Sequence, residues 1–204
     1  MKLYTQRAAC SLASHIIAYE LGLDMEVVRV DRATHRASDG QDYLTINPNG
    51  YVPTLVLDDG EILTEGTAIL QYLAGLKPET GLMPEDAKGQ RLIQSLLNFI
   101  ATELHKGFGP LWKPNTPAEY KTIVVDALGK RFDFVAPVLA AQPYLTGERF
   151  TIADAYLFTI LNWAKILKVD LARWPSLGQY LERVAARPRV QQALRDEHLL
   201  KAAA

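Results

Sequence analysis

The chain has 204 residues, a length that allows one large domain or two small ones, and 49% of them are hydrophobic, enough to form a buried core. Lysine and arginine number 22 and aspartate and glutamate 23, so the net charge is −1, which argues against nucleic acid or an anionic membrane as a partner. The single cysteine, Cys10, excludes an internal disulfide, a CxxC redox pair and a zinc site built from several cysteines.

No segment of the sequence has the pattern of a targeting signal or a membrane span. The short apolar start is followed by Gln6 and Arg7, unlike a secretory signal. The most apolar segment, 152–167, is interrupted by charged residues. We therefore expect a cytoplasmic protein, since a reducing compartment suits an unpaired cysteine.

The first 76 residues alternate between strand-like and helical patterns. Apolar residues between positions 12 and 23 recur at spacings of 4, 3 and 4, which is typical of an amphipathic helix. Two apolar runs on either side of Asp58-Asp59-Gly60 predict a β-hairpin. A βαβ unit followed by a ββα unit is the thioredoxin-like arrangement. In chain order we predict a strand at 2–5, a helix at 11–21, strands at 27–30, 54–57 and 61–63, and a helix at 68–76.

Only helical periodicity follows residue 84. Long helices are predicted at 86–108 and 117–141, and a helix at 151–169 is apolar on nearly every face, which places it at the centre of a core. Two shorter helices follow Trp174 and Arg187, each with proline in its first turn.

The charge balance also changes near residue 77. Residues 1–76 hold 5 basic and 10 acidic residues, a net charge of −5, whereas residues 77–204 hold 17 and 13, a net charge of +4. Prolines and a glycine separate the two parts. We predict a first domain over 1–76, a linker at 77–84, and an all-helical domain over 85–204.

Cys10 and Ser11 lie between the first strand and the first helix. Free N–H groups and the dipole at a helix N-terminus stabilise an anion, so a cysteine there favours the reactive thiolate, and Arg7 adds positive charge. The alternative is a buried, inert cysteine beside a serine that caps the helix. The position alone leaves both interpretations open.

Two other short segments suit an extended ligand. Pro53, at the entry to a strand, leaves backbone groups of its neighbour available, although without a known fold an ordinary loop proline is the better explanation. Glu65 and Gly66 begin the helix that closes the first domain, where helix N–H groups suit a ligand carboxylate and Glu65 suits a ligand ammonium. Simple helix capping is the alternative for this pair.

The predicted helix at 86–108 carries a polar stripe. Asn98, Thr102 and His105 are spaced i, i+4 and i+7 and would share one face of an α-helix. None of the three is Lys or Glu, which favours a cleft over solvent. His105 is a candidate hydrogen-bond donor or proton carrier. The histidines show no metal-ligand spacing, so no metal is expected.

Thr151 and Asp154 have the spacing of a capping box at the start of the central helix. We interpret both as structural, and expect the loss of Asp154 to impair folding rather than catalysis.

Taken together, these features resemble the cytosolic glutathione transferase family over the whole chain, and most closely its bacterial beta class. The residues that carry the resemblance are those around Cys10, the motif Asn47-Pro48-x-Gly50-x-Val52-Pro53, Thr64-Glu65-Gly66, Asn98, the segment 102–108, and the segment 150–158.

The resemblance implies that glutathione binds between the two domains and that the protein is a homodimer. Val52 would pair its backbone with the cysteinyl unit beside a cis Pro53, and Glu65 and Gly66 would hold the γ-glutamyl end. Cys10 would lie beside the glutathione sulfur, with which the cysteine of this class can form a mixed disulfide. The implied glutathione site comprises Cys10, His35, Val52, Pro53, Glu65, Gly66, Asn98, Thr102, Glu103 and His105, partly from the neighbouring subunit. As catalytic residues we rank Cys10 first, His105 second and Ser11 third. An apolar electrophile pocket is expected at Phe108, Leu111, Trp112 and Trp163.

Two positions depart from the family pattern. Gln6-Arg7-Ala8 replaces the usual Pro-Gly turn before the cysteine, and His35 stands where many relatives have a lysine that contacts glutathione. Histidine carries a positive charge only in mildly acidic solution, so we expect His35 to make glutathione binding depend on pH.

The function we predict is transfer of glutathione to hydrophobic electrophiles, with a glutathione-dependent peroxidase or disulfide-reductase side activity through Cys10. The alternative is a non-catalytic ligand or partner binding protein on the same fold.

Overall fold

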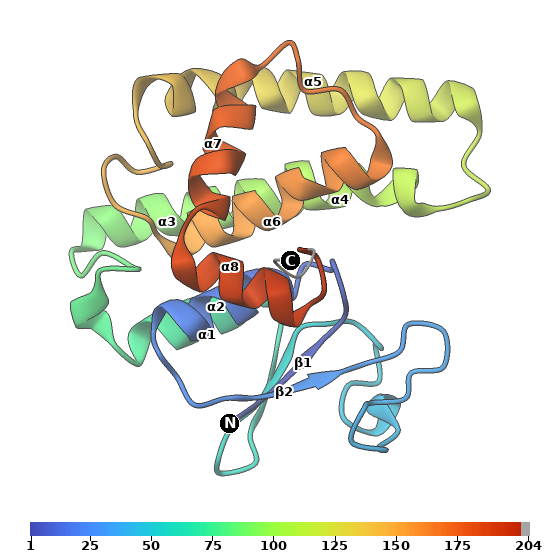
Figure 1. Cartoon of the computed structure of the whole chain (residues 1–204), viewed down its shortest axis with the longest axis vertical. Coiled ribbons are helices and arrows are strands. Elements are labelled where there is room, and N and C mark those ends of the chain that lie inside the picture. The colour runs from blue at the N-terminus through green and yellow to red at the C-terminus, as the bar shows by residue number, and fades with distance from the viewer. Residues whose placement is uncertain (201–204) are drawn as a thin grey trace. The chain divides into compact units, whose positions relative to one another are not determined.

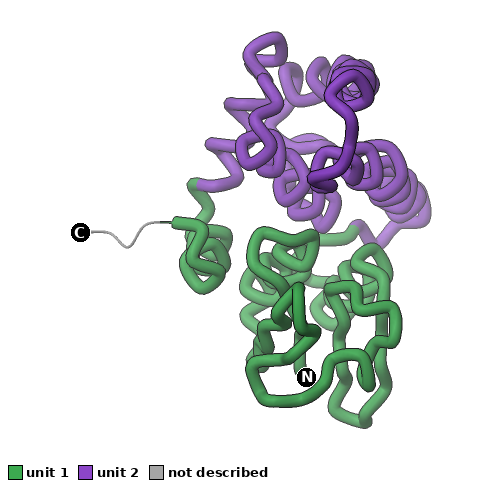
Figure 2. Tube along the Cα trace, turned by 90° about the vertical axis from the view of Figure 1, so that its right-hand side faces the viewer, with its two compact units in different colours: residues 1–83, 186–204 green, residues 84–185 purple. Residues whose placement is uncertain are grey.

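In the computed structural model, which describes residues 1–200, the chain divides into two compact units (Figure 2). The first unit comprises residues 1–83 and 186–204, and the second comprises residues 84–185. Among the described residues, no helix is both long and apolar enough to cross a membrane.

The first unit is built on a four-stranded mixed sheet in the order β2-β1-β3-β4. β1 (Lys2–Thr5) runs parallel to β2 (Glu26–Arg29) and antiparallel to β3 (Thr54–Val56), which pairs with β4 (Ile62–Thr64) as a hairpin. In this register Leu3 lies between Val27 and Leu55, and Leu3 and Leu55 are wholly buried. The predicted thioredoxin-like order of elements is therefore confirmed.

Helices α1 (Leu12–Glu20) and α2 (Gly66–Gly75) pack against each other in this unit. The last helix, α8 (Pro188–Asp196), also belongs to it and lies against α1 (Figure 1). The Arg187 guanidinium holds both carboxylate oxygens of Glu20, with its Nε and Nη2 each 2.8 Å away. A bidentate pair of this kind fixes both distance and orientation, so it ties the start of α8 to the end of α1.

The second unit is all-helical, as predicted. Its main helices are α3 (Ala87–Phe99), α5 (Ala118–Ala141), α6 (Ile152–Leu167) and α7 (Pro175–Ala185). α6 is buried without a break from Ile152 to Leu161, which confirms its predicted place at the centre of the core.

The stretch predicted as one helix over 86–108 changes its backbone geometry part-way. After α3, residues Ile100–His105 form a π-helix, Lys106–Phe108 form the short helix α4, and Gly109–Trp112 form a 3₁₀-helix. A π-helix has more residues per turn than an α-helix, is rare, and is often found at functional sites. Asn98 and Thr102 remain adjacent, with the Thr102 hydroxyl bonded to the Asn98 carbonyl, but the change of geometry takes His105 off the face that they share.

The first turn of α6 has the predicted capping box, with Thr151 at the N-cap. Asp154 is wholly buried, and its Oδ2 accepts hydrogen bonds from the Thr151 N–H at 3.0 Å and the Thr151 hydroxyl at 2.8 Å. Its Oδ1 accepts from the Leu145 N–H at 2.9 Å and the Tyr180 hydroxyl at 3.3 Å. One carboxylate thus links the loop before α6, the first turn of α6, and α7.

Candidate functional site

Cys10 lies in the turn between β1 and α1 and is half-buried. Its Sγ donates a hydrogen bond to the Val52 carbonyl oxygen at 3.2 Å. A carbonyl oxygen can accept this bond only from the protonated thiol, so the contact is lost when the thiolate forms. The fold thus brings Cys10 to a segment 42 residues away in the chain.

Ser11 occupies the N-cap position of α1, but its hydroxyl does not cap the helix. The hydroxyl accepts a hydrogen bond from the Gln6 N–H at 3.1 Å and donates to the Gln6 carbonyl at 3.3 Å. Ser11 is also wholly buried. Its side chain therefore closes the loop that carries Cys10, and of the two residues Cys10 is the better placed to meet a ligand.

The segment before β3 contains a cis peptide bond between Val52 and Pro53. A Cβ added to Gly66 would lie 3.6 Å from Cδ and Cγ of Pro53, an ordinary van der Waals distance. The N-terminus of α2 therefore lies next to this proline. Cys10, Val52, Pro53 and Gly66, which come from three separate parts of the sequence, form one continuous cluster in the first unit.

A buried hydrogen-bond network that we did not predict holds the Val52 segment in place. The Tyr51 carbonyl accepts hydrogen bonds from the Tyr43 hydroxyl at 2.5 Å and from Asn47 Nδ2 at 2.9 Å. Tyr43 and Asn47 are both buried. Asn47 belongs to the Asn-Pro-x-Gly-x-Val-Pro motif, and a buried amide needs hydrogen-bond partners, so its role could have been predicted from the sequence. The sequence around Tyr43 is irregular and contains no signal that would have predicted this hydrogen bond.

Glu65 adopts an unusual backbone conformation at the N-cap of α2, with φ +67° and ψ 114°. A residue other than glycine in such a region costs about 1–3 kcal/mol, and strain of this size is often found at functional sites. The Glu65 side chain is exposed, and the N–H groups of the first turn of α2 adjoin it. This arrangement places a carboxylate and an anion-binding helix terminus beside the Pro53 cluster.

His35 is half-buried, has φ +55°, and lies against Gly50. A Cβ at Gly50 would come within 2.8 Å of His35 Cε1 and 3.1 Å of Nδ1. Among the described residues, the buried Nδ1 of His35 has no hydrogen-bond partner. The His35 ring therefore fills the space left by the missing side chain of Gly50.

We expect the substitution Gly50→Ala to lower the free energy of unfolding by about 2–3 kcal/mol, because it adds a steric clash with His35 to the cost of a positive φ. Gly60→Ala is the matched control, since Gly60 also has a positive φ but no atom within 4 Å of its added Cβ. Urea unfolding of the three proteins measures the difference. Equal losses in the two variants would show that the His35 contact contributes nothing.

In the second unit, Asn98 and Thr102 are exposed. Asn98 Nδ2 donates to the Gln94 carbonyl at 2.8 Å, and the Thr102 hydroxyl donates to the Asn98 carbonyl at 3.0 Å. The half-buried Glu103 forms an ion pair with Arg131 of α5. These three polar side chains are thus held on or near the helix surface, apart from the environment of His105.

His105 instead contacts α6. Its Nδ1 lies 2.6 Å from the Tyr156 hydroxyl oxygen, and its ring meets Trp163 in an edge-to-face contact with centroids 4.9 Å apart. Burial, with a smaller contribution from the neighbouring Lys106 charge, lowers the pKa of His105 from 6.5 to about 4. The imidazole is therefore neutral at pH 7. We did not predict Tyr156, although a tyrosine on an all-apolar helix face needs a hydrogen-bond partner for its hydroxyl.

Three of the four residues expected to line an electrophile pocket, Phe108, Trp112 and Trp163, form one aromatic cluster. The Trp163 ring lies 6.1 Å from that of Phe108 and 5.4 Å from that of Trp112, both edge to face. Phe108 is wholly buried and Trp163 nearly so, whereas Leu111 and Trp112 are half-buried. Within the second unit, Leu111 and Trp112 are therefore the members that keep surface for a ligand.

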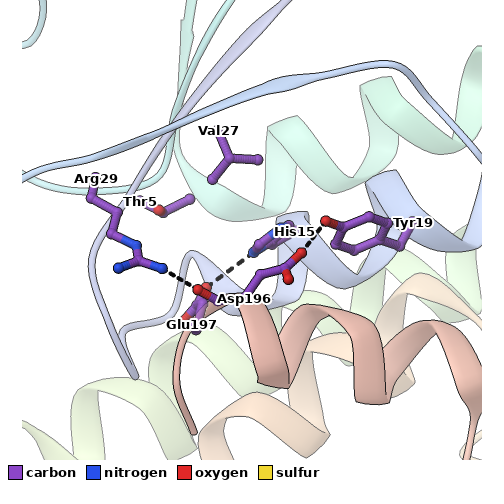
Figure 3. A pocket seen from close by; sticks show the side chains of 7 residues that line it. All are labelled: Thr5, His15, Tyr19, Val27, Arg29, Asp196 and Glu197. Carbon is purple, nitrogen blue, oxygen red and sulfur yellow. Dashed lines mark hydrogen bonds and ion pairs between the residues drawn. The ribbon is translucent and has the colours of Figure 1, made fainter. Parts of the chain in front are cut away.

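A pocket of about 160 Å³ lies elsewhere in the first unit, between β1, β2, α1 and the end of α8 (Figure 3). At its base the buried His15 Nδ1 lies 3.3 Å from Glu197 Oε1, and Glu197 Oε2 accepts a hydrogen bond from the Ala8 N–H at 3.1 Å. Glu197 thereby supports the loop that carries Cys10. Within residues 1–200, no group of three or more His, Cys, Asp or Glu residues could hold a metal ion.

Comparisons with known proteins agree with this geometry. The model of the glutathione S-transferase N-terminal domain matches residues 1–75, and that of the C-terminal domain matches residues 99–188. "Glutathione S-transferase GstA" of Escherichia coli O157:H7 is 48% identical over 200 residues, which cover 98% of this chain and all of that protein. The chain belongs to the glutathione S-transferase family.

Solved glutathione S-transferases have the same fold. The structure described as a ternary complex of BphK, a bacterial GST, superposes with a TM-score of 0.94 at 47% identity, covering 97% of this chain and all of that one. A sphingomonad glutathione S-transferase complexed with glutathione superposes with a TM-score of 0.93 at 41% identity, and the match covers 98% of this chain and all of that one. The predicted family and fold are confirmed.

Proposed function

We propose that this glutathione S-transferase belongs to the bacterial beta class and transfers glutathione to hydrophobic electrophiles, as in detoxification. The observation that carries the proposal is the meeting of Cys10, the cis Val52-Pro53 pair and the N-terminus of α2 in one cluster of the first unit. The sphingomonad glutathione S-transferase, whose structure is a complex with glutathione, supports the choice of ligand.

In the proposed complex, residues 1–76 bind the tripeptide, and residues 85–204, joined by the linker 77–84, supply the electrophile pocket. The Val52 backbone pairs with the cysteinyl unit, and the Glu65 carboxylate and Gly66 N–H hold the zwitterionic γ-glutamyl end. The site positions the glutathione thiolate beside an apolar surface, where a bound electrophile is attacked without a bimolecular encounter. Leu111 and Trp112 are the half-buried members of that surface.

We also propose thiol–disulfide exchange through Cys10. The Cys10 thiolate attacks the glutathione sulfur of a mixed disulfide between glutathione and another thiol, forming a Cys10–glutathione disulfide and releasing the other thiol as its thiolate. A glutathione thiolate then attacks the glutathione sulfur of the Cys10–glutathione disulfide, forming glutathione disulfide and releasing the Cys10 thiolate. The bond from Cys10 Sγ to the Val52 carbonyl holds the thiol at this site between cycles.

The proposed assembly is a cytoplasmic homodimer in which Asn98, Thr102 and Glu103 complete the partner's site. The charges of the two sequence halves, −5 and +4, are complementary and suit contact between the first domain of one subunit and the second domain of the other. Light scattering on the purified protein tests the assembly, and a mass equal to one chain would overturn it.

A panel of aryl halides, hydroperoxides and mixed disulfides, each assayed with glutathione, tests the proposed function. Turnover of an electrophile supports the transferase, and turnover of a disulfide supports the side activity. Glutathione binding measured by calorimetry without turnover of any compound would favour the alternative, a carrier on a glutathione S-transferase fold.

We propose that the His35 side chain contacts the glycyl carboxylate of glutathione. Because many relatives have lysine at this position, we expect His35→Lys to bind glutathione at least as tightly as the wild type. We expect His35→Gln, which removes the basic side chain, to bind about three- to fivefold more weakly. Calorimetry on the three proteins checks this, and equal affinities of the wild type and His35→Gln would contradict the role.

A further inference from the structure

The His105 side chain is held by contacts from one neighbouring helix. It is the last residue of the π-helix, and both of its ring contacts come from α6. The Tyr156 ring stands perpendicular to the imidazole, at an interplanar angle of 89° with centroids 5.9 Å apart. Tyr156 is itself 4% exposed, so the core of α6 fixes its position. The Tyr156 hydroxyl, which forms the hydrogen bond with His105 Nδ1, is therefore held in a fixed position.

The chemistry of the two groups decides the direction of this bond. A neutral imidazole has one N–H donor and one nitrogen acceptor, and a phenol can either donate or accept. The bare imidazole nitrogen is the stronger base of the two possible acceptors, and the phenol O–H is the stronger acid of the two possible donors. Pairing the stronger donor with the stronger acceptor places the proton of His105 on Nε2.

We propose that Tyr156 is a positioning residue: its hydroxyl donates to His105 Nδ1, fixes the ring, and keeps the imidazole proton on Nε2. The inference rests on the proposed function in that it assigns His105 a part in the transferase site. His105 then offers a neutral N–H donor to a thiolate or to an electrophile oxygen, and Nε2 does not act as a base.

Nitrogen NMR on full-length protein labelled with ¹⁵N-histidine tests the tautomer without any ligand. The chain has 4 histidines, so His105 is assigned as the signal absent from a folded His105→Gln variant. We expect the Nε2–H form in the wild type at pH 7, with an Nδ1 resonance that shifts when Tyr156→Phe removes the hydroxyl. An Nδ1–H form in the wild type, or an Nδ1 resonance unaffected by Tyr156→Phe, would overturn the proposal.

Steady-state kinetics with glutathione and an aryl halide test the consequence for the reaction. Tyr156→Phe should lower kcat about tenfold, which is less than the loss of a catalytic acid or base itself because the His105 imidazole is still present, with the KM for glutathione changed less than about twofold. Tyr180→Phe is the matched control, because it also removes a buried hydroxyl that bonds to α6, at the Asp154 carbonyl 3.0 Å away. It should lower stability while leaving kcat and the His105 resonances unchanged.

The two experiments separate this inference from the proposed function. A wild type with no turnover contradicts the transferase, and the NMR spectrum then decides the tautomer alone. An active wild type whose kcat is unchanged by Tyr156→Phe, or is lowered equally by Tyr180→Phe, overturns the positioning role.

Discussion

Replacing Cys10 with alanine is expected to abolish thiol–disulfide exchange, by at least about a hundredfold, while conjugation of glutathione to an aryl halide stays within about tenfold of wild type. Exchange requires the Cys10 sulfur as a nucleophile and a leaving group. Conjugation uses the sulfur of glutathione, which the proposed Val52, Glu65 and Gly66 contacts still hold. Assays of both reactions on the same preparations measure the ratio.

Cys10→Ser is the matched control for this substitution. A serine hydroxyl can keep the hydrogen bond to the Val52 carbonyl, now 3.2 Å from the cysteine sulfur, but it is a far weaker nucleophile. The serine variant should therefore lose exchange like the alanine variant and retain conjugation at least as well. If both variants lose conjugation as fully as exchange, Cys10 serves both reactions; if exchange survives in both, free glutathione carries it.

The elements of the fold were predictable because each depends on a local pattern. Short apolar runs beside turn residues mark the strands of the hairpin, and uninterrupted apolar character marks α6 as the centre of its unit. The contact of α8 with the rest of the first unit was not predictable from a local pattern. It depends on pairs such as Glu20 with Arg187, 167 residues apart, and on Glu197 with Ala8. No periodicity within either segment indicates such a partner.

The residues of the candidate site likewise divide into those that local rules predict and those that they do not. The positions of Cys10 and Glu65 at helix N-termini follow from sequence, since capping and dipole rules act over a few residues. The π-helix at Ile100–His105 does not, because its apolar spacing also fits an α-helix, and it separates His105 from Asn98 and Thr102. The positive φ of Glu65 was equally hidden, since a pattern rule would place glycine there.

Asp154 is the residue whose loss we expect to cost the most stability. Its buried carboxylate accepts hydrogen bonds from two backbone N–H groups and two hydroxyls. Asp154→Ala would leave these donors buried without an acceptor, and we expect the free energy of unfolding to fall by about 3–5 kcal/mol. Asp126→Ala, on the exposed face of α5, should change it by less than about 0.5 kcal/mol. Urea unfolding at pH 7 compares the two.

The pH dependence of stability provides an independent test of this carboxylate. Burial raises the pKa of Asp154 from 3.8 to about 6 in the folded protein, and the hydrogen-bond donors oppose the rise. Between these values the folded state binds more protons at this site than the unfolded state, so the contribution of Asp154 to stability falls as pH rises from about 4 to about 6. Relative to Asp154→Asn, which cannot titrate, the wild type should lose up to about 3 kcal/mol across that window. A difference between the two proteins that is constant or grows with pH would mean that the buried carboxylate titrates at or below its ordinary pKa, and that its hydrogen bonds outweigh its burial.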